Sequence, residues 1–275
     1  MTKTLNVAMI GGGFMGKAHA MAYAAMPMFF WPAPAIPHRK VVVDLTDGAA
    51  NEARDRFGFD EASSDWQATV NRPDIDIVDI CTPNNTHAKI AIEALKAGKH
   101  VICEKPLAST IEEAEAMAEA AKSSGSTTMV AFNYRRTPAV ALAKKFIDDG
   151  RIGDVINFRG TYLQDWSADP DGPLSWRFQK SVAGSGAVGD IGTHVVDLAH
   201  YLVGPIETVQ AITSTYVKTR PLQKGAVDKL GASQKSSGGE RAEVDVDDEV
   251  MSMVRFANGA IGSIEATRNA WGRNN

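Results

Sequence analysis

The stretch Leu5-Asn-Val-Ala-Met-Ile-Gly-Gly-Gly-Phe-Met-Gly16 combines an apolar run with a Gly-x-Gly-x-x-Gly loop. The apolar run predicts a β-strand and residues 14–25 predict a helix, so the loop lies where a strand turns into a helix. In that context Gly11 allows a tight turn, Gly13 lets the backbone approach a pyrophosphate, and Gly16 lets the helix pack closely against the strand. The amino end of the helix would face the phosphate anion. The stretch therefore predicts a dinucleotide-binding site made by Gly11, Gly13, Phe14, Met15 and Gly16.

The rest of the first 132 residues alternates short apolar runs with helical patterns, which is typical of a doubly wound parallel sheet. Strands are expected at residues 5–10, 40–44, 76–81, 100–103 and 127–132, and helices at residues 49–57, 86–97 and 110–124. Thr110 and Glu113 have the spacing of a helix capping box, and Gly98 and Gly125 lie where helices should end. We therefore predict a Rossmann domain over residues 1–132.

Asp44 ends the second predicted strand, where a carboxylate accepts hydrogen bonds from the adenosine ribose and repels a 2'-phosphate. Leu45 and Thr46 follow, with no arginine to receive such a phosphate, so NAD is predicted as the cofactor rather than NADP. The gap from Gly16 to Asp44 exceeds the usual ~20 residues because residues 26–38 intervene. Four prolines in that segment predict an ordered, aromatic-rich loop, packed on the sheet edge or, alternatively, part of a subunit interface.

Composition excludes several classes of protein. The 275 residues suffice for two cores, because single cores stop growing near about 250 residues. A net charge of -4 provides no basic patch for nucleic acid or an anionic membrane, and no apolar tract reaches the ~20 residues of a membrane span. We therefore expect a cytoplasmic protein that binds a small molecule. Cys81 and Cys103 each end an apolar run, which favours buried, reduced thiols over a disulfide or a metal site, so no metal is predicted.

Residues 133–275 have a different pattern and are predicted to form a second α/β domain. A helix is expected at residues 137–149, closed by Gly150, followed by a strand at 154–164 and a helix at 191–202. Two strands, at residues 248–256 and 260–267, would meet at Asn258-Gly259, a strong signal for a two-residue hairpin. Residues 218–243 are rich in Gly, Ser and Lys, and we expect them to form a mobile surface excursion.

Three further motifs carry chemically useful side chains. Cys81-Thr-Pro-Asn-Asn-Thr-His87 follows a predicted strand at the carboxyl edge of the sheet, where the cofactor crevice of an open α/β sheet lies. Glu104-Lys105-Pro106 follows the next strand at the same edge and introduces an amine there. Gly-Asp190-Ile-Gly-Thr-His194 places an acid and an imidazole four positions apart. If Asp190 opens the predicted helix, both side chains lie on one of its faces.

In order and spacing these motifs resemble the glucose–fructose oxidoreductase / inositol dehydrogenase (Gfo/Idh/MocA) family, and the resemblance covers nearly the whole chain. It implies an NAD-dependent oxidoreductase acting on CH-OH groups of sugars, with a second domain built on a large, open, mostly antiparallel sheet. In this family the peptide bond that matches Lys105-Pro106 is often cis.

The resemblance also implies roles for individual residues. Lys105, Asp190 and His194 match the catalytic trio of the family. Further cofactor contacts are expected from Asp44, Thr82, Pro83, Asn84, His87, Glu104, Lys105, Asn133, Trp176 and Arg177. Substrate contacts are expected from Lys105, Tyr134, Arg135, Gln164, Asp190 and His194.

Oxidation of a secondary alcohol needs a base for the hydroxyl proton while hydride leaves the carbon. An unperturbed imidazole, with a pKa of about 6.5, suits that role, whereas the ordinary pKa of lysine is about 10.4. We therefore assign His194 as the base, Asp190 as the residue that orients substrate and imidazole, and Lys105 as the cation that stabilises the developing alkoxide. The swapped assignment, with a neutral Lys105 as the base, is the alternative.

Residues 132–140 and 160–170 resemble the branch of the family that oxidises the C3 hydroxyl of 1,6-anhydroglucose (levoglucosan) with NAD. Their mixture of aromatic residues with amides and acids suits a compact, unphosphorylated sugar, and such an activity belongs to carbohydrate catabolism. Inositol or another unphosphorylated pyranose is the alternative within this chemistry. A glycosidase that acts by transient oxidation with NAD, and a nicotinamide-binding regulator without turnover, are the alternatives outside it.

Two expectations concern assembly. Open sheets of this kind commonly associate face to face, so a homo-oligomer, a dimer or a tetramer, is expected. Family members usually continue for many tens of residues beyond the position that matches Asn275. We therefore expect the second domain to be incomplete here and to lack its last strands and a returning helix.

Overall fold

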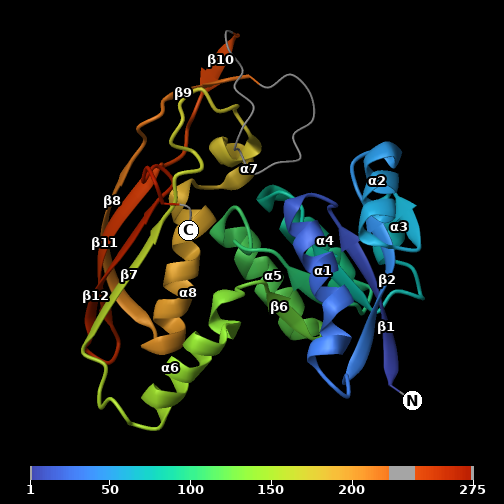
Figure 1. Ribbon diagram of the computed structural model, residues 1–275, viewed down its shortest axis with the longest axis horizontal. Helices are drawn as coiled ribbons and strands as arrows, with labels where there is room; N and C mark the ends of the chain where they lie inside the picture. The colour runs from blue at the N-terminus through green and yellow to red at the C-terminus, as the bar shows by residue number, and fades with distance from the viewer. Residues whose placement is uncertain (1, 223–238, 274–275) are drawn as a thin grey trace. The chain divides into compact units, whose positions relative to one another are not determined.

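In the computed structural model, residues 2–222 and 239–273 are described, and the chain divides into two compact units, Met1–Ala131 and Phe132–Asn275. Within the described part of the first unit, a six-stranded parallel sheet has the order β3 (Glu61–Ser63), β2 (Ala35–Val43), β1 (Lys3–Ile10), β4 (Ile77–Ile80), β5 (His100–Cys103) and β6 (Thr128–Val130) (Figure 1). This strand order is that of a dinucleotide-binding Rossmann fold. The predicted fold class of the first domain is therefore confirmed.

Helices cover both faces of this sheet. Successive side chains of β1 point to opposite faces. Met9 packs with Ala20 of α1 (Phe14–Phe29) and Ala53 of α2 (Asp47–Phe57), whereas Ala8 and Ile10 lie in the core formed with the remaining helices. Those helices are α3 (Trp66–Val70), α4 (His87–Lys96) and α5 (Ile111–Ser124). The sheet is thus doubly wound, as predicted.

The predicted helix boundaries follow from local capping. Thr110 caps α5 by accepting a hydrogen bond from the N–H of Glu113 at 3.2 Å, and Glu113 accepts in return from the N–H of Ser109. Gly98 and Gly125 follow their helices with φ of 74° and 66°, which confirms them as stop signals. The short elements β3 and α3 were not predicted, because three to five residues carry too little periodicity.

The proline-rich segment 26–38 differs from the predicted loop. Helix α1 runs through Pro27 to Phe29, and strand β2 includes Pro37. Both prolines lie where they remove little hydrogen bonding. Pro27 is in the last turn of its helix, and Pro37 is in the part of β2 that pairs with β1, before the stretch Val41–Val43 that also pairs with β3.

The aromatic residues of that segment face solvent. Phe29 is 81% exposed, Phe30 is 58% exposed and Trp31 is 89% exposed. The expectation that they pack on the sheet edge is therefore wrong. Their alternative role, in a subunit interface, stays a prediction.

The second unit contains a four-stranded sheet in the order β7 (Asn157–Leu163), β12 (Ile261–Thr267), β11 (Glu249–Phe256) and β8 (Ile206–Ser214). β11 is antiparallel to both neighbours, while β7 and β12 are parallel, so the sheet is mostly antiparallel as predicted. Gly259, with a φ of 88°, is in the predicted β11–β12 hairpin turn. Helix α8 (Thr193–Leu202) lies along one face of this sheet, where Val195 and Ala199 pack on Phe256 and Ile264 (Figure 1).

Shorter elements complete this unit. Helix α6 (Pro138–Asp148) is the predicted helix at 137–149, and α7 is a single turn (Lys180–Ala183). The predicted surface excursion at 218–243 is partly wrong, because β9 (Thr219–Pro221) and β10 (Arg241–Glu243) form a two-stranded sheet and Arg220 is buried. Residues 223–238 of that prediction lie outside the described residues.

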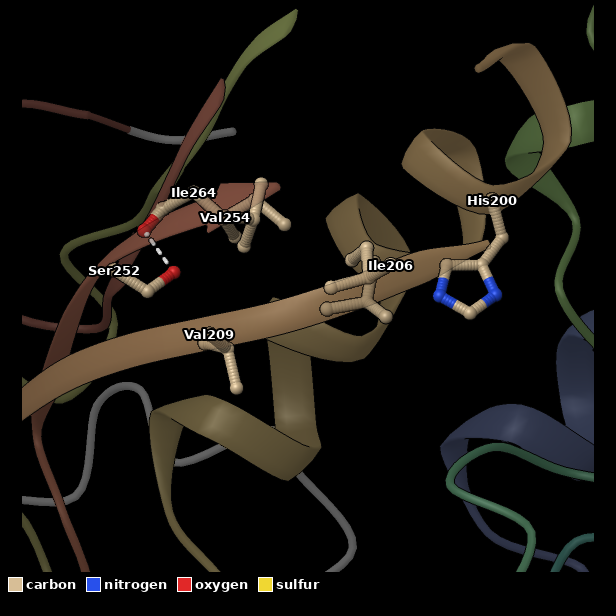
Figure 2. A pocket seen from close by; sticks show the side chains of 7 residues that line it. His200, Ile206, Val209, Ser252, Val254 and Ile264 are labelled. Carbon is tan, nitrogen blue, oxygen red and sulfur yellow. Dashed lines mark hydrogen bonds between the residues drawn. The ribbon is translucent and has the colours of Figure 1, made fainter. Parts of the chain in front are cut away.

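An open, largely apolar groove with a volume of about 260 Å³ runs between α8 and the edge strand β8 (Figure 2). It is lined by Val196, His200, Ile206, Val209, Ser252, Val254 and Ile264. None of the predicted site residues is among them, so this groove is separate from the candidate site. Among the described residues, no helix is long and apolar enough to cross a membrane.

Candidate active site

The glycine loop has the geometry that the sequence predicts. Gly11 has a φ of 104°, and a Cβ there would lie 2.8 Å from the carbonyl oxygen of Cys81. A Cβ on Gly16 would lie 2.2 Å from the carbonyl oxygen of Gly11, so helix and loop pack too closely for a side chain. At Gly13, the N-cap of α1, a Cβ would meet nothing within 4 Å. The uncapped amino end of α1 is therefore open to an anionic group such as a pyrophosphate.

Asp44 lies immediately after β2 and its carboxylate is fixed beside this loop. One oxygen accepts the N–H of Gly12 at 3.0 Å, and the other accepts the N–H of Leu45 at 2.7 Å. Each carboxylate oxygen can accept a further hydrogen bond. The arrangement fits the ribose hydroxyls of a dinucleotide, and Leu45, which is 93% exposed, offers no cation for a 2'-phosphate.

The next two loops are braced against each other by His87. Its ring is fully buried, with Nδ1 3.0 Å from the carbonyl oxygen of Pro106 and Nε2 2.9 Å from that of Thr82. We therefore interpret His87 as a support for the two loops rather than a direct cofactor contact. Pro83 precedes a short 3₁₀ turn (Asn84–Thr86), in which Asn84 is also buried.

Glu104, Lys105 and Pro106 directly follow β5, and the Lys105-Pro106 peptide bond is cis. Lys105 is half-buried, whereas the Glu104 side chain is buried and accepts the N–H of Lys105 through Oε2 at 3.1 Å. The side chain of Glu104 thus holds the backbone of Lys105 by a hydrogen bond.

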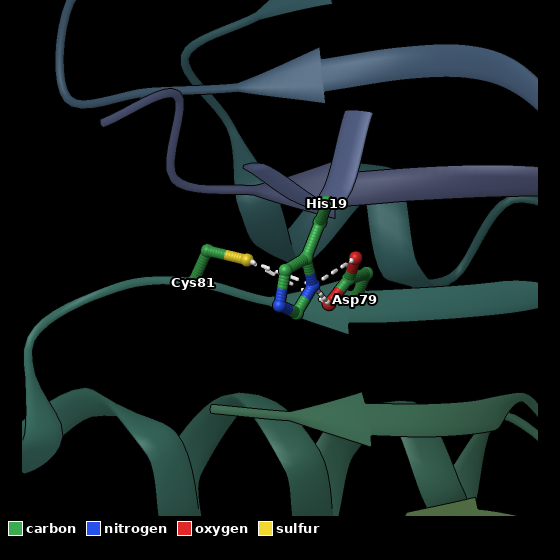
Figure 3. A group of neighbouring side chains, drawn as sticks. All are labelled: His19, Asp79 and Cys81. Carbon is green, nitrogen blue, oxygen red and sulfur yellow. Dashed lines mark hydrogen bonds and ion pairs between the residues drawn. The ribbon is translucent and has the colours of Figure 1, made fainter. Parts of the chain in front are cut away.

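A network around His19 was not predicted. His19 on α1 lies between Asp79, which is in β4, and Glu104. Cys81 lies beside its ring (Figure 3). The sequence carries one signal for it: Asp79 interrupts an otherwise apolar central strand, and a carboxylate there needs a partner. Cys81 and Cys103 are both free thiols, and burial raises the pKa of each.

In the second unit, Asp190 lies in a π-helical turn (Val188–Gly192) that leads into α8. The N–H of Thr193 donates to the carbonyl of Val188, five residues back. The helix therefore begins before Ile191, and Asp190 lies inside a turn rather than opening the helix as expected. A wide turn holds one more residue than a 3.6-residue repeat predicts, and such turns are frequent at functional sites.

His194 is buried among aromatic rings. The centroid of its ring lies 4.6 Å from that of Tyr134 and 5.9 Å from those of Tyr162 and Phe132. The hydroxyls of Tyr134 and Tyr162 hydrogen-bond each other, and the amide of Gln164 donates to the Tyr162 hydroxyl at 3.3 Å. The structure thus brings together His194, Tyr134 and Gln164, three of the predicted substrate residues.

A second unpredicted residue, Arg268, supports Asp190 and the loop that holds Trp176 and Arg177. Its side chain is fully buried, with Nη1 3.6 Å from Asp190 Oδ2 and 3.3 Å from the carbonyl oxygen of Arg177. Its Nη2 donates to the carbonyl of Asp247 at 3.1 Å. No sequence signal separates it from the surface arginines, because its side chain packs on Trp166 and Phe178, which are distant in the sequence.

Arg135 and Asn133 were expected to contact the substrate and the cofactor, respectively. The guanidinium of Arg135 forms an ion pair with Asp197 of α8, with Nε 2.9 Å from Oδ2, and lies over the ring of Tyr201. Arg135 thus helps to hold α8, and the expectation that it faces the substrate stays a prediction. Asn133 is exposed. Lys105 belongs to the first unit, and Asp190 and His194 belong to the second.

Comparison with known proteins agrees with this layout. Residues 5–132 match the model of an oxidoreductase family with an NAD-binding Rossmann fold, and residues 140–275 match that of the GFO/IDH/MocA C-terminal domain. A levoglucosan dehydrogenase of Pseudarthrobacter phenanthrenivorans is 64% identical over 273 residues, which are 99% of this chain and 70% of that protein. A scyllo-inositol 2-dehydrogenase (NAD(+)) of Bacillus subtilis is 30% identical over 98% of this chain and 69% of its own.

Solved structures are similar as well. A levoglucosan dehydrogenase in complex with NADH and levoglucosan has a TM-score of 0.92 at 63% identity, over 99% of this chain and 69% of that one. Its complex with NADH alone has a TM-score of 0.93. The chain therefore belongs to the Gfo/Idh/MocA family of NAD-binding oxidoreductases.

Proposed function

We propose that this chain is an NAD-dependent dehydrogenase that oxidises the C3 hydroxyl of levoglucosan to 3-keto-levoglucosan. The observation that carries the proposal is the 64% identity to a levoglucosan dehydrogenase over nearly the whole chain. Inositol dehydrogenases, the alternative within the same chemistry, are more distant at 30% identity. The uncapped amino end of α1 at Gly13 and the carboxylate of Asp44 suit NAD.

The nucleotide would be held by the first unit. The amino end of α1 would receive the pyrophosphate at Gly11, Gly13, Phe14, Met15 and Gly16, and Asp44 would accept the ribose hydroxyls. Thr82, Pro83, Asn84, Glu104 and Lys105 would form the floor of the crevice, while Asn133, Trp176 and Arg177 remain proposed contacts to the nicotinamide half. When bound, NAD takes up the hydride that leaves the substrate carbon.

His194 would remove the proton of the reacting hydroxyl as the hydride departs. An imidazole suits this role because its ordinary pKa is about 6.5. Asp190, tethered by Arg268, would orient the substrate and the imidazole, and Lys105 would stabilise the developing alkoxide by its positive charge. Tyr134 and Gln164 would bind other hydroxyls of the sugar. The swapped assignment gives the proton to a neutral Lys105.

Absorbance of NADH tests the proposal directly. Purified protein is mixed with NAD and one sugar at a time: levoglucosan, myo-inositol, glucose or xylose. Each assay is repeated with NADP in place of NAD. We expect fast reduction with levoglucosan and NAD. Faster reduction of NAD with myo-inositol would instead favour an inositol dehydrogenase. No reduction with any sugar despite NAD binding would contradict the proposal, and product release without net NADH would favour the glycosidase.

His194→Asn and Lys105→Met separate the two assignments of the base. Each variant is assayed from pH 6 to 10 with levoglucosan and NAD. If His194 is the base, His194→Asn loses the acidic limb of the kcat profile and Lys105→Met keeps it. The reverse pattern assigns the base to Lys105.

We also propose a homo-oligomer that forms through the open face of the sheet in the second unit. On the face opposite α8, Met251 and Met253 of β11, Ile212 of β8 and Ile261 of β12 are all at least half exposed. Met251→Glu with Met253→Lys should reduce the mass measured by light scattering if that face associates. An unchanged mass would reject this surface. The cytoplasmic location expected from the sequence also stays a proposal, which cell fractionation tests.

A further inference from the structure

His19 joins two buried carboxylates, one in strand β4 and one directly after strand β5. Its Nδ1 lies 2.9 Å from Asp79 Oδ2, and its Nε2 lies 3.0 Å from Glu104 Oε1. Asp79 is fully buried at the centre of the sheet, and Glu104 is 5% exposed. Figure 3 shows the imidazole reaching from α1 to the side chains of Asp79 and Cys81.

The hydrogen-bonding pattern fits a protonated ring. When both carboxylates are ionised they only accept hydrogen bonds, so both ring nitrogens of His19 donate, as only the imidazolium form can. Burial of the ring lowers the pKa of His19, but hydrogen bonds to Asp79, Cys81 and Glu104 outweigh it and raise the pKa well above its ordinary value. The charge in turn compensates two carboxylates that are expensive to bury alone.

Two further groups complete the surroundings of the ring. Tyr23, one helical turn after His19, donates its hydroxyl to Asp79 Oδ2 at 2.8 Å. The thiol of Cys81 lies 3.6 Å from His19 Nδ1. Both contacts act on the Asp79 side of the imidazole.

Glu104 transmits the position of this ring to Lys105. Its Oε1 contacts His19, and its Oε2 accepts the backbone N–H of Lys105 at 3.1 Å. His19 itself is three residues after Gly16 on α1, the helix that begins at the glycine loop. One imidazolium therefore connects the nucleotide helix with the backbone of the candidate catalytic lysine.

We propose that His19 is a positioning residue that fixes Glu104, and through Glu104 the backbone of Lys105, to the helix that begins at the nucleotide loop. The inference rests on the proposed function, because it is there that Lys105 acts on the substrate. Two hydrogen bonds, from His19 to Glu104 and from the N–H of Lys105 to Glu104, make Lys105 move together with α1. The distance between the nucleotide helix and the lysine backbone therefore stays fixed.

The same side chains could be read as metal ligands, since potential ligand atoms of His19, Asp79 and Cys81 lie within 4.8 Å of one another. A metal ligand must present an unprotonated ring nitrogen. Here both ring nitrogens lie at hydrogen-bonding distance from carboxylate oxygens, at 2.9 and 3.0 Å. The geometry favours the protonated ring.

A double-mutant cycle tests the coupling. His19→Gln, Glu104→Gln and the double variant are assayed with levoglucosan and NAD, and NADH binding is followed by its fluorescence. We expect His19→Gln to lower kcat by about tenfold to a hundredfold, as for a misplaced catalytic group, with a change in the NADH dissociation constant of less than about threefold. The double variant should be no slower than Glu104→Gln alone, because His19 acts through Glu104.

Tyr23→Phe is the matched control. It removes a hydrogen bond to Asp79 from the same helix and leaves the contact of His19 with Glu104 intact, so its kcat should stay near that of the parent. Losses that multiply in the double variant, or an equal fall of kcat in Tyr23→Phe, would overturn the proposal.

A spectroscopic measurement does not depend on any variant folding. Nitrogen-15 NMR of the imidazole should show His19 doubly protonated at pH 8 in the parent protein, and a neutral ring or a bound metal would overturn the inference. If the parent oxidises no sugar, the proposed function fails while the NMR result still reports on His19. If the parent is active, Lys105→Ala is inactive and His19→Gln is normal, only this inference fails.

Discussion

The guanidinium of Arg268 lies 3.6 Å from the carboxylate of Asp190 and has no exposed surface, while Asp190 itself is partly open to solvent. A buried cation thus holds an acid that we assign to substrate orientation. The same guanidinium donates to the carbonyls of Arg177 and Asp247, which ties the π-helical turn of Asp190 to two neighbouring loops.

Arg268→Lys should therefore impair turnover more than its conservative chemistry suggests. Lysine keeps the charge but cannot reach the acid and both carbonyls from one planar group. We expect kcat to fall by about tenfold or more through misplacement of Asp190. Arg241→Lys, at an exposed arginine paired with Asp171, is the control and should be near normal. A lower melting temperature with unchanged kcat would show that Arg268 serves the fold alone.

The glycine loop gives a matched pair of variants. Gly16→Ala should destabilise the protein, because its Cβ would lie 2.2 Å from the carbonyl oxygen of Gly11. Gly13→Ala meets nothing within 4 Å, so the melting temperature should be nearly unchanged while NADH binding weakens. Thermal unfolding and a fluorescence titration of NADH separate the two effects. Undiminished NADH binding by Gly13→Ala would mean that the nucleotide does not approach this loop.

Much of the first domain was predictable because its signals are local. The glycine loop, the Thr110 cap and the stop glycines each depend on residues within a few positions, and these boundaries are confirmed. Pro27 and Pro37 misled the prediction because their cost depends on where a helix ends and which strand lies alongside.

The residues that support the candidate site, His19 and Arg268, were not predicted from the sequence. The contacts of His19 with Asp79 and of Arg268 with Asp190 each join residues 60 or more positions apart, and no spacing rule predicts such contacts. The π-helical turn at Asp190 was also missed, since a 3.6-residue repeat does not predict its extra residue. Motifs thus predict candidate site residues, whereas the contacts that hold those residues are seen only in the tertiary structure.

Cofactor choice should depend on Asp44. Asp44→Ser combined with Leu45→Arg removes a carboxylate that repels a 2'-phosphate and adds a cation at an exposed position. We expect kcat/KM to rise at least about tenfold for NADP and to fall for NAD, which corresponds to about 1.4 kcal/mol. Asp47→Ser, on the same segment, is the control. An unchanged preference for NAD would indicate that specificity is set elsewhere.

Metal removal should have no effect on turnover. Although His19, Asp79 and Cys81 lie close together, we assign their contacts to hydrogen bonding with a protonated ring. Dialysis against EDTA and re-assay in chelator-treated buffer should leave kcat unchanged, and elemental analysis should find less than stoichiometric zinc. Loss of activity that zinc restores would contradict this assignment.

The charge on His19 also predicts how stability varies with pH. Its pKa is raised on folding, so the folded state holds a proton that the unfolded state releases near its ordinary pKa of about 6.5. This contribution to stability is fully present below pH ~6.5 and declines as pH rises toward the raised pKa of the folded protein. The free energy of unfolding should then fall by up to about 1.4 kcal/mol per pH unit above that point because of this one proton. Urea unfolding at pH 6, 7, 8 and 9 should give a shallower decline for His19→Gln than for the parent, and parallel declines would mean that His19 carries no extra proton in the folded state.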